Sequence, residues 1–448
     1  MFSVSSGRGT DRRADRAGRW ENWGRTQSVV PREVVAVGDA DDVVAAVRRA
    51  RSEAVTVKAV GSGHSFTGIA VAPGIQIDTS AMTGLVHADP ANRRVTVRAG
   101  TRLHEMPAIL EPLGLAMPNL GDIDRQSISG ATSTGTHGTG RNFGGLATQI
   151  VGVRMVTGTG ETLTVTDADR ATLEATALGL GALGILTEIT LACVPAFAIE
   201  ATERAMSVDD AIAGFLDAVT THDHHEFYWF PHTDVALSKT NRRLPADTAA
   251  TGPGRLRRVI DDEILSNGIF GVMCAAGARF PSVTAPLARV AGAALSSRQM
   301  VEASHDAFVS ARRVRFREME YAIPLAEIPD AIGEIRRLIA DCGHRVSFPI
   351  EVRAAAADEL MLSTASGQTT GYIAVHRYHG DRPDNYFTDI EEILFRRGGR
   401  PHWAKMHTRT ADDLREVYPR FDEFLALRDV LDPDRVFAND YLTTVLGR

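Results

Sequence analysis

One run of small and hydroxylated residues, from Gln126 to Gly140, constrains the fold more than any other feature of the chain. It reads QSISGATSTGTHGTG, and four of its positions are glycine. A buried core segment needs large apolar side chains, and a disordered linker rarely combines isoleucine, threonine and histidine in this way. Such a run suits backbone that packs against an extended polar ligand, because hydroxyl and N–H groups can donate hydrogen bonds along it. The run predicts a binding loop inside a folded domain.

Two further glycine clusters accompany this run. GSGHSFTG, residues 61–68, directly follows a β-branched strand, and its glycines allow positive φ and a close approach of backbone to a ligand. Exposed N–H groups in such a turn form a nest suited to a pyrophosphate. LGLGALGILTEI, residues 178–189, reads equally well as a tight helix-to-strand connection. No cluster matches GxxxxGK[ST], which excludes a P-loop, and none opens a helix as a Rossmann GxGxxG turn does.

The bulk properties exclude several classes of protein. A length of 448 residues predicts two or three domains, and a net charge of −7 gives no reason to expect nucleic acid as a partner. The cysteines are Cys193, Cys274 and Cys342; their wide, odd spacing argues against a disulfide framework or a metal site and fits the cytoplasm. No window is apolar enough for a membrane span. Residues 1–19, rich in arginine and aspartate, are expected to be a mobile leader.

The rest of the chain predicts an α+β fold in two parts. Up to residue 194, short strands alternate with helices, which predicts a mixed sheet. The elements expected there are strands at Val34–Val37, Val55–Val60 and Gly74–Asp78, a helix capped by Asp39, and a helix at Leu103–Leu113. From residue 195 the pattern predicts an antiparallel sheet backed by helices. The elements expected there are strands at Glu226–Phe230, Met319–Ile323, Ser347–Ala354 and Gly371–Tyr378, a helix at Ile328–Ala340, and a polar loop at Arg242–Arg257.

Two sets of charged residues stand out in the second part. Glu351 and Arg353 are two apart on an expected strand, so both side chains face the same way. They form either an exposed ion pair or one wall of a polar pocket. His402-Trp403-Ala404-Lys405 combines two polar residues with a tryptophan that could simply plug the core.

Together, the three glycine clusters and the HWAK segment resemble the vanillyl-alcohol oxidase flavoprotein superfamily, whose FAD-binding domain is of the PCMH type. The likeness is strongest to its sugar-lactone branch. It implies an FAD-binding domain over residues 20–194 and a substrate (cap) domain over 195–400, with an antiparallel sheet flanked by helices. It also implies a C-terminal segment, 401–448, that returns to the flavin.

The resemblance also implies a set of cofactor-binding residues. His64 matches a histidine that is commonly bonded to the 8α-methyl group of the isoalloxazine, so the FAD is expected to be covalent. Asp122 stands where an alditol oxidase would show a serine, which favours a lactone as substrate. The positions that match the flavin site are Gly61, Ser62, Gly63, His64, Ser65, Asp122, Ser127, Gly130, Thr134, Gly135, Thr136, His137 and Ile185.

On the substrate side, the resemblance implies that Lys405, His376, Glu351 and Arg353 form the catalytic set. Lys405 and His376 are alternative bases; a charged Lys405 would instead stabilise an alkoxide or the reduced flavin. Arg353 would hold the lactone and Glu351 its hydroxyls. Ala404 stands where glycine is common.

The implied reaction is oxidation of an aldonolactone, similar to L-gulono-1,4-lactone, by hydride transfer to flavin N5. Its product would enolise to an ascorbate-type enediol. Oxidation of an open-chain alditol is the alternative, and a non-enzymatic flavin-binding scaffold is disfavoured because it needs no charged pocket. The electron acceptor stays open between O₂ and a redox protein or quinone.

Overall fold

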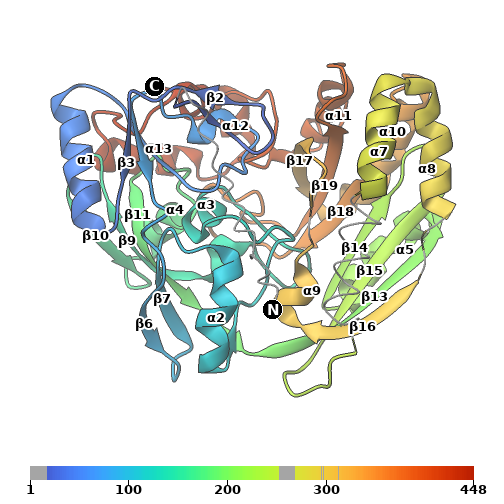
Figure 1. Ribbon diagram of the computed structural model, residues 1–448, viewed down its shortest axis with the longest axis horizontal. Helices are drawn as coiled ribbons and strands as arrows, with labels where there is room; N and C mark the ends of the chain where they lie inside the picture. Colours follow the sequence, from blue (N-terminus) through green and yellow to red (C-terminus); the bar gives the residue numbers. More distant parts are fainter. Residues whose placement is uncertain (1–17, 252–267, 294, 296, 311) are drawn as a thin grey trace, which may run out of the picture.

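The computed structural model describes residues 18–251, 268–293, 295, 297–310 and 312–448. The expected leader therefore lies almost entirely outside the described residues. Regular structure begins at β1 (Trp20–Glu21), which pairs with β2 (Ser28–Val29). Figure 1 shows two lobes, one built mainly from the first half of the chain and the other around a large antiparallel sheet.

A small parallel sheet opens the first lobe. Its strand order is β3 (Glu33–Ala36), β5 (Ile75–Asp78), β4 (Val57–Val60). Helix α1 (Ala40–Ser52) makes the crossover, and the Asp39 side chain caps it as predicted. The buried face of α1 packs on the sheet through Val43 and Val47.

The second sheet of this lobe is antiparallel. Its order is β10 (Thr162–Thr166), β9 (Ile150–Val156), β11 (Ile185–Ala192), β7 (Arg94–Arg98), β6 (Leu85–Asp89). The predicted single mixed sheet is therefore wrong. Short turns join β6 to β7 and β9 to β10, and strands joined by short turns pair antiparallel, whereas the parallel pairs are grouped around the crossover helix α1.

Short helices and 3-10 turns complete the first lobe. The expected helix at 103–113 is a chain of α2 (Met106–Leu110) between two 3-10 turns, because Pro107 and Pro112 interrupt its hydrogen bonds. The others are α3 (Ile128–Ser133), α4 (Arg170–Thr176) and the 3-10 turns Gly68–Ala70 and Leu146–Gln149. A two-stranded ladder joins β8 (Leu115–Ala116) to β12 (Val194–Pro195).

The second lobe is an eight-stranded antiparallel sheet, as predicted. Its order is β16 (Arg298–Ala303), β13 (Phe197–Ser207), β15 (Val235–Pro245), β14 (His224–Trp229), β18 (Ile350–Ala355), β19 (Thr370–Tyr378), β17 (Phe316–Pro324), β20 (Arg400–Pro401). The expected polar loop is wrong at its start, since β15 continues to Pro245, where Arg242 pairs with Glu200 on the facing strand. Residues 252–257 of that loop lie outside the described residues.

Helices pack against this sheet. The covering helices are α5 (Val208–Thr221), α7 (Phe270–Arg279), α8 (Thr284–Ala293), α9 (Ser304–Phe308), α10 (Ile328–Asp341) and α11 (Tyr386–Phe395). Helix α10 confirms the expected helix at 328–340, with Pro329 in its first turn, and buries a row of isoleucines against the sheet. Within the described part of the chain, no helix is long and apolar enough to cross a bilayer.

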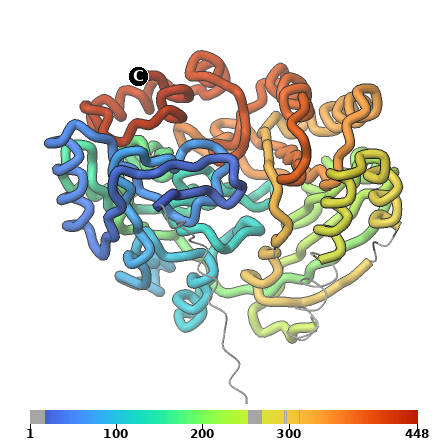
Figure 2. Tube along the Cα trace, turned by 45° about the horizontal axis from the view of Figure 1, so that its top comes forward, coloured from blue at the N-terminus to red at the C-terminus, as the bar shows by residue number. Residues whose placement is uncertain are grey.

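The C-terminal helices return to the first lobe. Helices α12 (Ala411–Val417), α13 (Phe421–Leu431) and α14 (Asp440–Leu446) contribute side chains to its core. The Asn439 side chain donates to the carbonyls of Gly68 and Val71, at 2.9 Å each. Figure 2 accordingly shows the C-terminal end of the chain beside its N-terminal part.

Candidate active site

The loop after β4 is fixed by close contacts with three other parts of the chain. Gly63 has a φ of +70°, which favours glycine, and a Cβ on Gly61 would collide with the Ser127 hydroxyl. The Trp23 N–H donates to the Gly63 carbonyl at 2.7 Å, and the Phe66 N–H donates to the Ala404 carbonyl at 2.6 Å. This loop is therefore held in place by the N-terminal segment, the run at 126–140 and the C-terminal segment.

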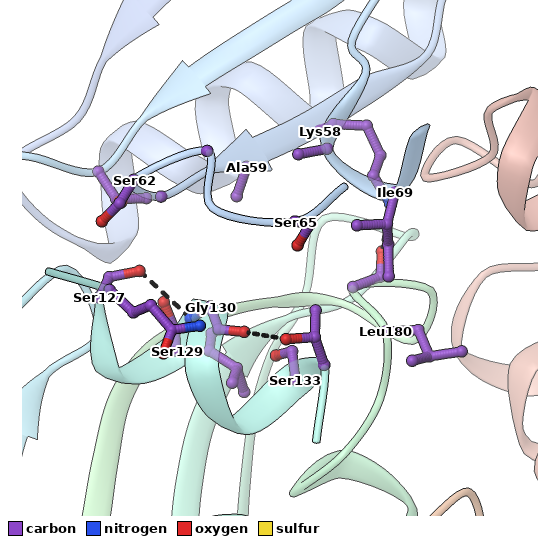
Figure 3. Close-up of a pocket in the computed structure, with 18 of the residues that line it drawn as sticks. Lys58, Ala59, Ser62, Ser65, Ile69, Ser127, Ser129, Gly130, Ser133 and Leu180 are labelled. Atoms are coloured by element: carbon purple, nitrogen blue, oxygen red, sulfur yellow. Dashed lines mark hydrogen bonds between the residues drawn. The ribbon is translucent and has the colours of Figure 1, made fainter. Parts of the chain in front are cut away.

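A first cavity lies between this loop and the short helix α3 (Figure 3). Ser127 caps α3 by accepting from the Gly130 N–H at 3.2 Å, and the Thr134 hydroxyl donates to the Gly130 carbonyl at 2.9 Å. Its lining residues are Lys58, Ala59, Gly61, Ser62, Gly63, His64, Ser65, Ile69, Ala70, Thr79, Gln126, Ser127, Ser129, Gly130, Ser133, Thr134, Leu180, Gly181, Gly184, Ile185 and Leu186. None of these described residues is a carboxylate, so the cavity suits an anionic ligand with an apolar end.

Lys58 is the one lysine or arginine among these described lining residues, and it is not among the site residues expected from the sequence. It is 3% exposed, and its Nζ donates to the Gly181 carbonyl at 3.2 Å. Burial, helped by the nearby Arg428, lowers the pKa of Lys58 to about 7, against the opposing pull of Asp432. A lysine inside the otherwise apolar strand VTVKAV was the signal that could have identified it.

A second cavity adjoins the first, and His64 and Gln126 line both. Its lining residues are Trp23, His64, Phe66, Asp122, Ile123, Gln126, Thr136, His137, Glu320, Arg353, His402, Ala404 and Lys405. The His64 ring stacks against Trp23, with centroids 5.9 Å apart. The fold thus brings residues from both lobes and from the C-terminal segment to one place.

Three of the expected site residues lie outside both of these linings in the described structure. Gly135 forms the turn after α3, with a φ of +82°. Glu351 lies behind Arg353, whose guanidinium it contacts, and His376 lies behind Glu318. Glu351 and His376 are both buried, so neither is an exposed surface residue.

Lys405 belongs to a buried chain of three polar groups. Its ammonium donates to the Glu318 carboxylate, and His376 Nε2 lies 3.4 Å from the other oxygen of that carboxylate. Strand register explains the second contact, because β17 places Glu318 directly opposite His376 on β19. Burial alone would raise the pKa of Glu318, but Lys405 and His376 outweigh it and hold that pKa well below its ordinary value.

Glu320, two residues further along β17, faces two histidines. His137 Nε2 lies 3.4 Å from a Glu320 oxygen, and its ring stacks on Tyr372 with centroids 3.7 Å apart. Burial would raise the pKa of Glu320, but His137 outweighs it and lowers that pKa to about 2. The i, i+2 spacing of Glu318 and Glu320 is the pattern that selected Glu351 and Arg353, and it could have identified this pair.

His137, Glu320 and His402 lie close enough together to surround a metal ion. However, His402 Nδ1 accepts a hydrogen bond from the Ala404 N–H at 3.1 Å. Burial lowers the pKa of His402 to about 3, so the ring is neutral and its proton sits on Nε2. His402 therefore offers no free lone pair to a cation.

Arg353 is surrounded by carboxylates. It contacts Glu351, its Nε donates to Glu226 at 3.1 Å, and its terminal nitrogen lies 3.6 Å from Asp122. Arg312 contacts the Asp122 carboxylate as well. Burial would raise the pKa of Asp122, but Arg312 and then Arg353 outweigh it, so that pKa lies below its ordinary value. No local pattern marked Arg312 or Glu226, which reach this cluster from separate elements.

Comparison with known proteins gives a consistent result. The family described as D-arabinono-1,4-lactone oxidase matches residues 189–445, and the FAD binding domain family matches residues 31–166. An L-gulono-1,4-lactone dehydrogenase of Mycobacterium tuberculosis is 40% identical over 96% of this chain and 99% of its own. An alditol oxidase of a Streptomyces species is 29% identical over 95% of this chain and 98% of its own.

Among solved structures, a solvent-stable cholesterol oxidase superposes with a TM-score of 0.82. It covers 96% of this chain and 98% of its own at 16% identity, a level that shows the shared fold alone. The α+β class with an FAD-binding part and an antiparallel sheet is confirmed, and so is the resemblance to the sugar-lactone branch. The chain belongs to the D-arabinono-1,4-lactone oxidase family and is an FAD-dependent oxidoreductase.

Proposed function

We propose that this protein oxidises a hydroxyl group of an aldonolactone similar to L-gulono-1,4-lactone. The observation that carries the proposal is the second cavity, which meets the first at His64 and is lined by Asp122, Arg353 and Lys405. Charged groups of both signs suit a small ligand with a carbonyl and several hydroxyls. The activities for which the family and the more similar relative are named support a lactone over an open-chain alditol.

The first cavity fits FAD. Its glycine and hydroxyl lining lets a dinucleotide approach the backbone, and Lys58 supplies positive charge without a carboxylate nearby in the lining. The residues that would hold FAD there are Gly61, Ser62, Gly63, Ser65, Ser127, Gly130, Thr134 and Ile185. When bound, FAD supplies the chemistry that removes a hydride from the substrate carbon.

His64 would carry the covalent bond to the flavin. Its place in the lining of both cavities supports this assignment, since a tether must stand where the cofactor passes from one to the other. Acid precipitation tests it: the yellow colour should stay with the wild-type protein and leave with the supernatant for His64→Ala. Colour released from both would disprove the bond while leaving the FAD site intact.

Lys405, Glu318 and His376 would move the proton of the substrate hydroxyl. Lys405 lines the cavity, so it meets the hydroxyl, and it accepts that proton as it passes one of its own to Glu318. The proton that Glu318 takes on Oε2 reaches His376 Nε2, which faces the other oxygen, as the carboxyl group turns. His376 Nδ1 donates to the Pro349 carbonyl at 3.1 Å, so Nε2 holds the lone pair that takes the proton.

Arg353 and Asp122 would orient the lactone ring. Arg353 donates to the carbonyl oxygen, and Asp122 accepts from a ring hydroxyl. Glu351 would position the Arg353 guanidinium, which it contacts. The product would be a ketolactone that enolises to an ascorbate-type enediol.

The electron acceptor is either O₂ or a redox protein or quinone, and we propose the cytoplasm as the compartment. The three cysteines are free in the structure, which supports a reducing environment.

Steady-state turnover tests the proposed substrate. Lactones and alditols are compared with a dye as electron acceptor, and then with O₂ alone. We expect the highest kcat/KM for an aldonolactone; a higher value for an alditol would replace the proposed substrate, and turnover with O₂ alone would identify an oxidase.

A further inference from the structure

The segment between α9 and β17 places Arg312 directly behind the second cavity. Arg312 contacts the carboxylate of Asp122, and its guanidinium lies 3.8 Å from a Glu351 oxygen. The Ser310 N–H also donates to the Asp122 carbonyl, at 3.0 Å. Asp122 is therefore held by this segment through both its backbone and its side chain.

The surroundings of Asp122 make Arg312 its main cationic partner. The charged groups that act on it are Arg312, Arg353, Glu318 and Lys405. Arg353 already contacts Glu351 and Glu226, and Lys405 is bonded to Glu318. Arg312 has Asp122 as its close partner among the described residues and lies farther from Glu351.

We propose that Arg312 is a positioning residue that holds the Asp122 carboxylate turned into the cavity, so that Asp122 selects substrates by the hydroxyl opposite it. The proposal rests on the proposed function, because it needs a polyhydroxylated substrate in the second cavity. Asp122 lines that cavity and Arg312 does not, so Arg312 acts on the substrate through Asp122, its closest partner. A carboxylate that accepts a hydrogen bond from a hydroxyl discriminates strongly against an analogue that lacks it.

A purely structural role for Arg312 makes different predictions. The guanidinium also lies 6.0 Å from the ring of Phe316, so it could simply pack the start of β17. Its loss would then lower the Tm, reduce kcat/KM by the same factor for every substrate, and leave the pH profile of kcat/KM unchanged. Four variants separate the two roles: Arg312→Met, Arg312→Lys, Asp122→Asn and the double variant Arg312→Met/Asp122→Asn. Arg336→Met is the matched control, because Arg336 of α10 pairs with Asp209 of α5 and lines neither cavity.

The experiment measures KM and kcat across pH for a hydroxylated substrate and for the analogue that lacks one ring hydroxyl. We expect Arg312→Met to raise KM by about tenfold to a hundredfold, the value of a hydrogen bond to a charged group, with a smaller change in kcat. The preference for the hydroxylated substrate should fall with it. The acidic limb of kcat/KM should move to higher pH, because Asp122 loses the cation that lowers its pKa. Arg312→Lys should recover part of the loss, and the double variant should be no worse than Asp122→Asn.

Equal losses for both substrates, an unchanged pH profile, or additive effects in the double variant would overturn the proposal. The flavin spectrum and the Tm of each variant show whether it is folded, and Asp122→Asn tests the same contact if Arg312→Met is not. Turnover of lactones and alditols by the wild-type protein tests the proposed substrate separately from the role of Arg312. If an alditol and not a lactone is turned over, the proposed substrate fails, and the same variants are compared on that alditol and its deoxy analogue.

Discussion

The two cavities have opposite kinds of lining. The first is lined mainly by glycine, small hydroxylated and apolar residues from three stretches of sequence, with no carboxylate among its described lining residues. The second is lined by charged side chains, including Asp122, Glu320, Arg353 and Lys405, that come from strands and loops far apart in the chain. The first should therefore be sensitive to added volume and the second to changed charge.

Lys405→Met should give the largest effect. It removes the group that we propose meets the substrate hydroxyl, and it leaves Glu318 without its ammonium partner. Flavin reduction by substrate should slow by about a hundredfold to ten-thousandfold, the usual contribution of a proton-transfer group. Stopped-flow absorbance measures this, and Lys405→Arg controls for charge. Near-normal reduction with an unchanged flavin spectrum would remove Lys405 from the relay.

The lowered pKa of Glu320 should make the free energy of unfolding depend on pH. Its pKa lies at about 2 in the folded protein against an ordinary 4.5, so the folded state favours the ionised form. The resulting stabilisation, on the order of 3 kcal/mol, is present above pH 4.5 and is lost as the pH falls toward 2. Glu320→Gln should flatten this acid dependence of the Tm. If the Tm of this variant falls with acid as steeply as that of the wild type, the His137 contact does not stabilise the carboxylate.

Gly61→Ala tests the volume limit of the first cavity. The new Cβ would meet the Ser127 hydroxyl and should cost about 1–3 kcal/mol, seen as less flavin per protein chain. Adding Ser127→Ala should restore part of the flavin, although it also removes the cap of α3. If the double variant binds less flavin than either single one, the contact between these two loops is not what requires glycine.

Lys58→Met should give the smallest effect, and it is best measured with reversible FAD binding in a His64→Ala background. Lys58 loses its charge near pH 7, so the FAD affinity of His64→Ala should fall as the pH rises through that value. With Lys58→Met added, the affinity should be lower at pH 6 and nearly independent of pH. A pH dependence that survives the substitution would assign it to another group.

The different origins of the two linings along the chain also explain which parts of the site could be predicted from the sequence. The first cavity was predictable because its glycine clusters are contiguous, and strand-like segments with helical runs between them predicted the antiparallel sheet. From local pattern alone, the charged cluster was predictable only where two members share a strand, as Glu351 and Arg353 do, whereas Asp122 was identified through the family resemblance. Glu226 and Arg312 reach it through the pairing of β14 with β18 and through a loop, and neither relation leaves a local pattern.

The error over the mixed sheet has the same origin. Each strand was identified locally, but the choice of partner depends on how the connections run in space. The assignment of β3, β4 and β5 to a separate sheet becomes clear only once α1 and the loop after β4 are placed.

Anaerobic mixing of the purified yellow protein with L-gulono-1,4-lactone tests the central claim most directly. We predict that the flavin absorbance bleaches with saturating dependence on lactone, that Lys405→Met slows this bleaching without changing the starting spectrum, and that a ketolactone forms in equal amount. A flavin that stays oxidised with every aldonolactone offered would contradict the account.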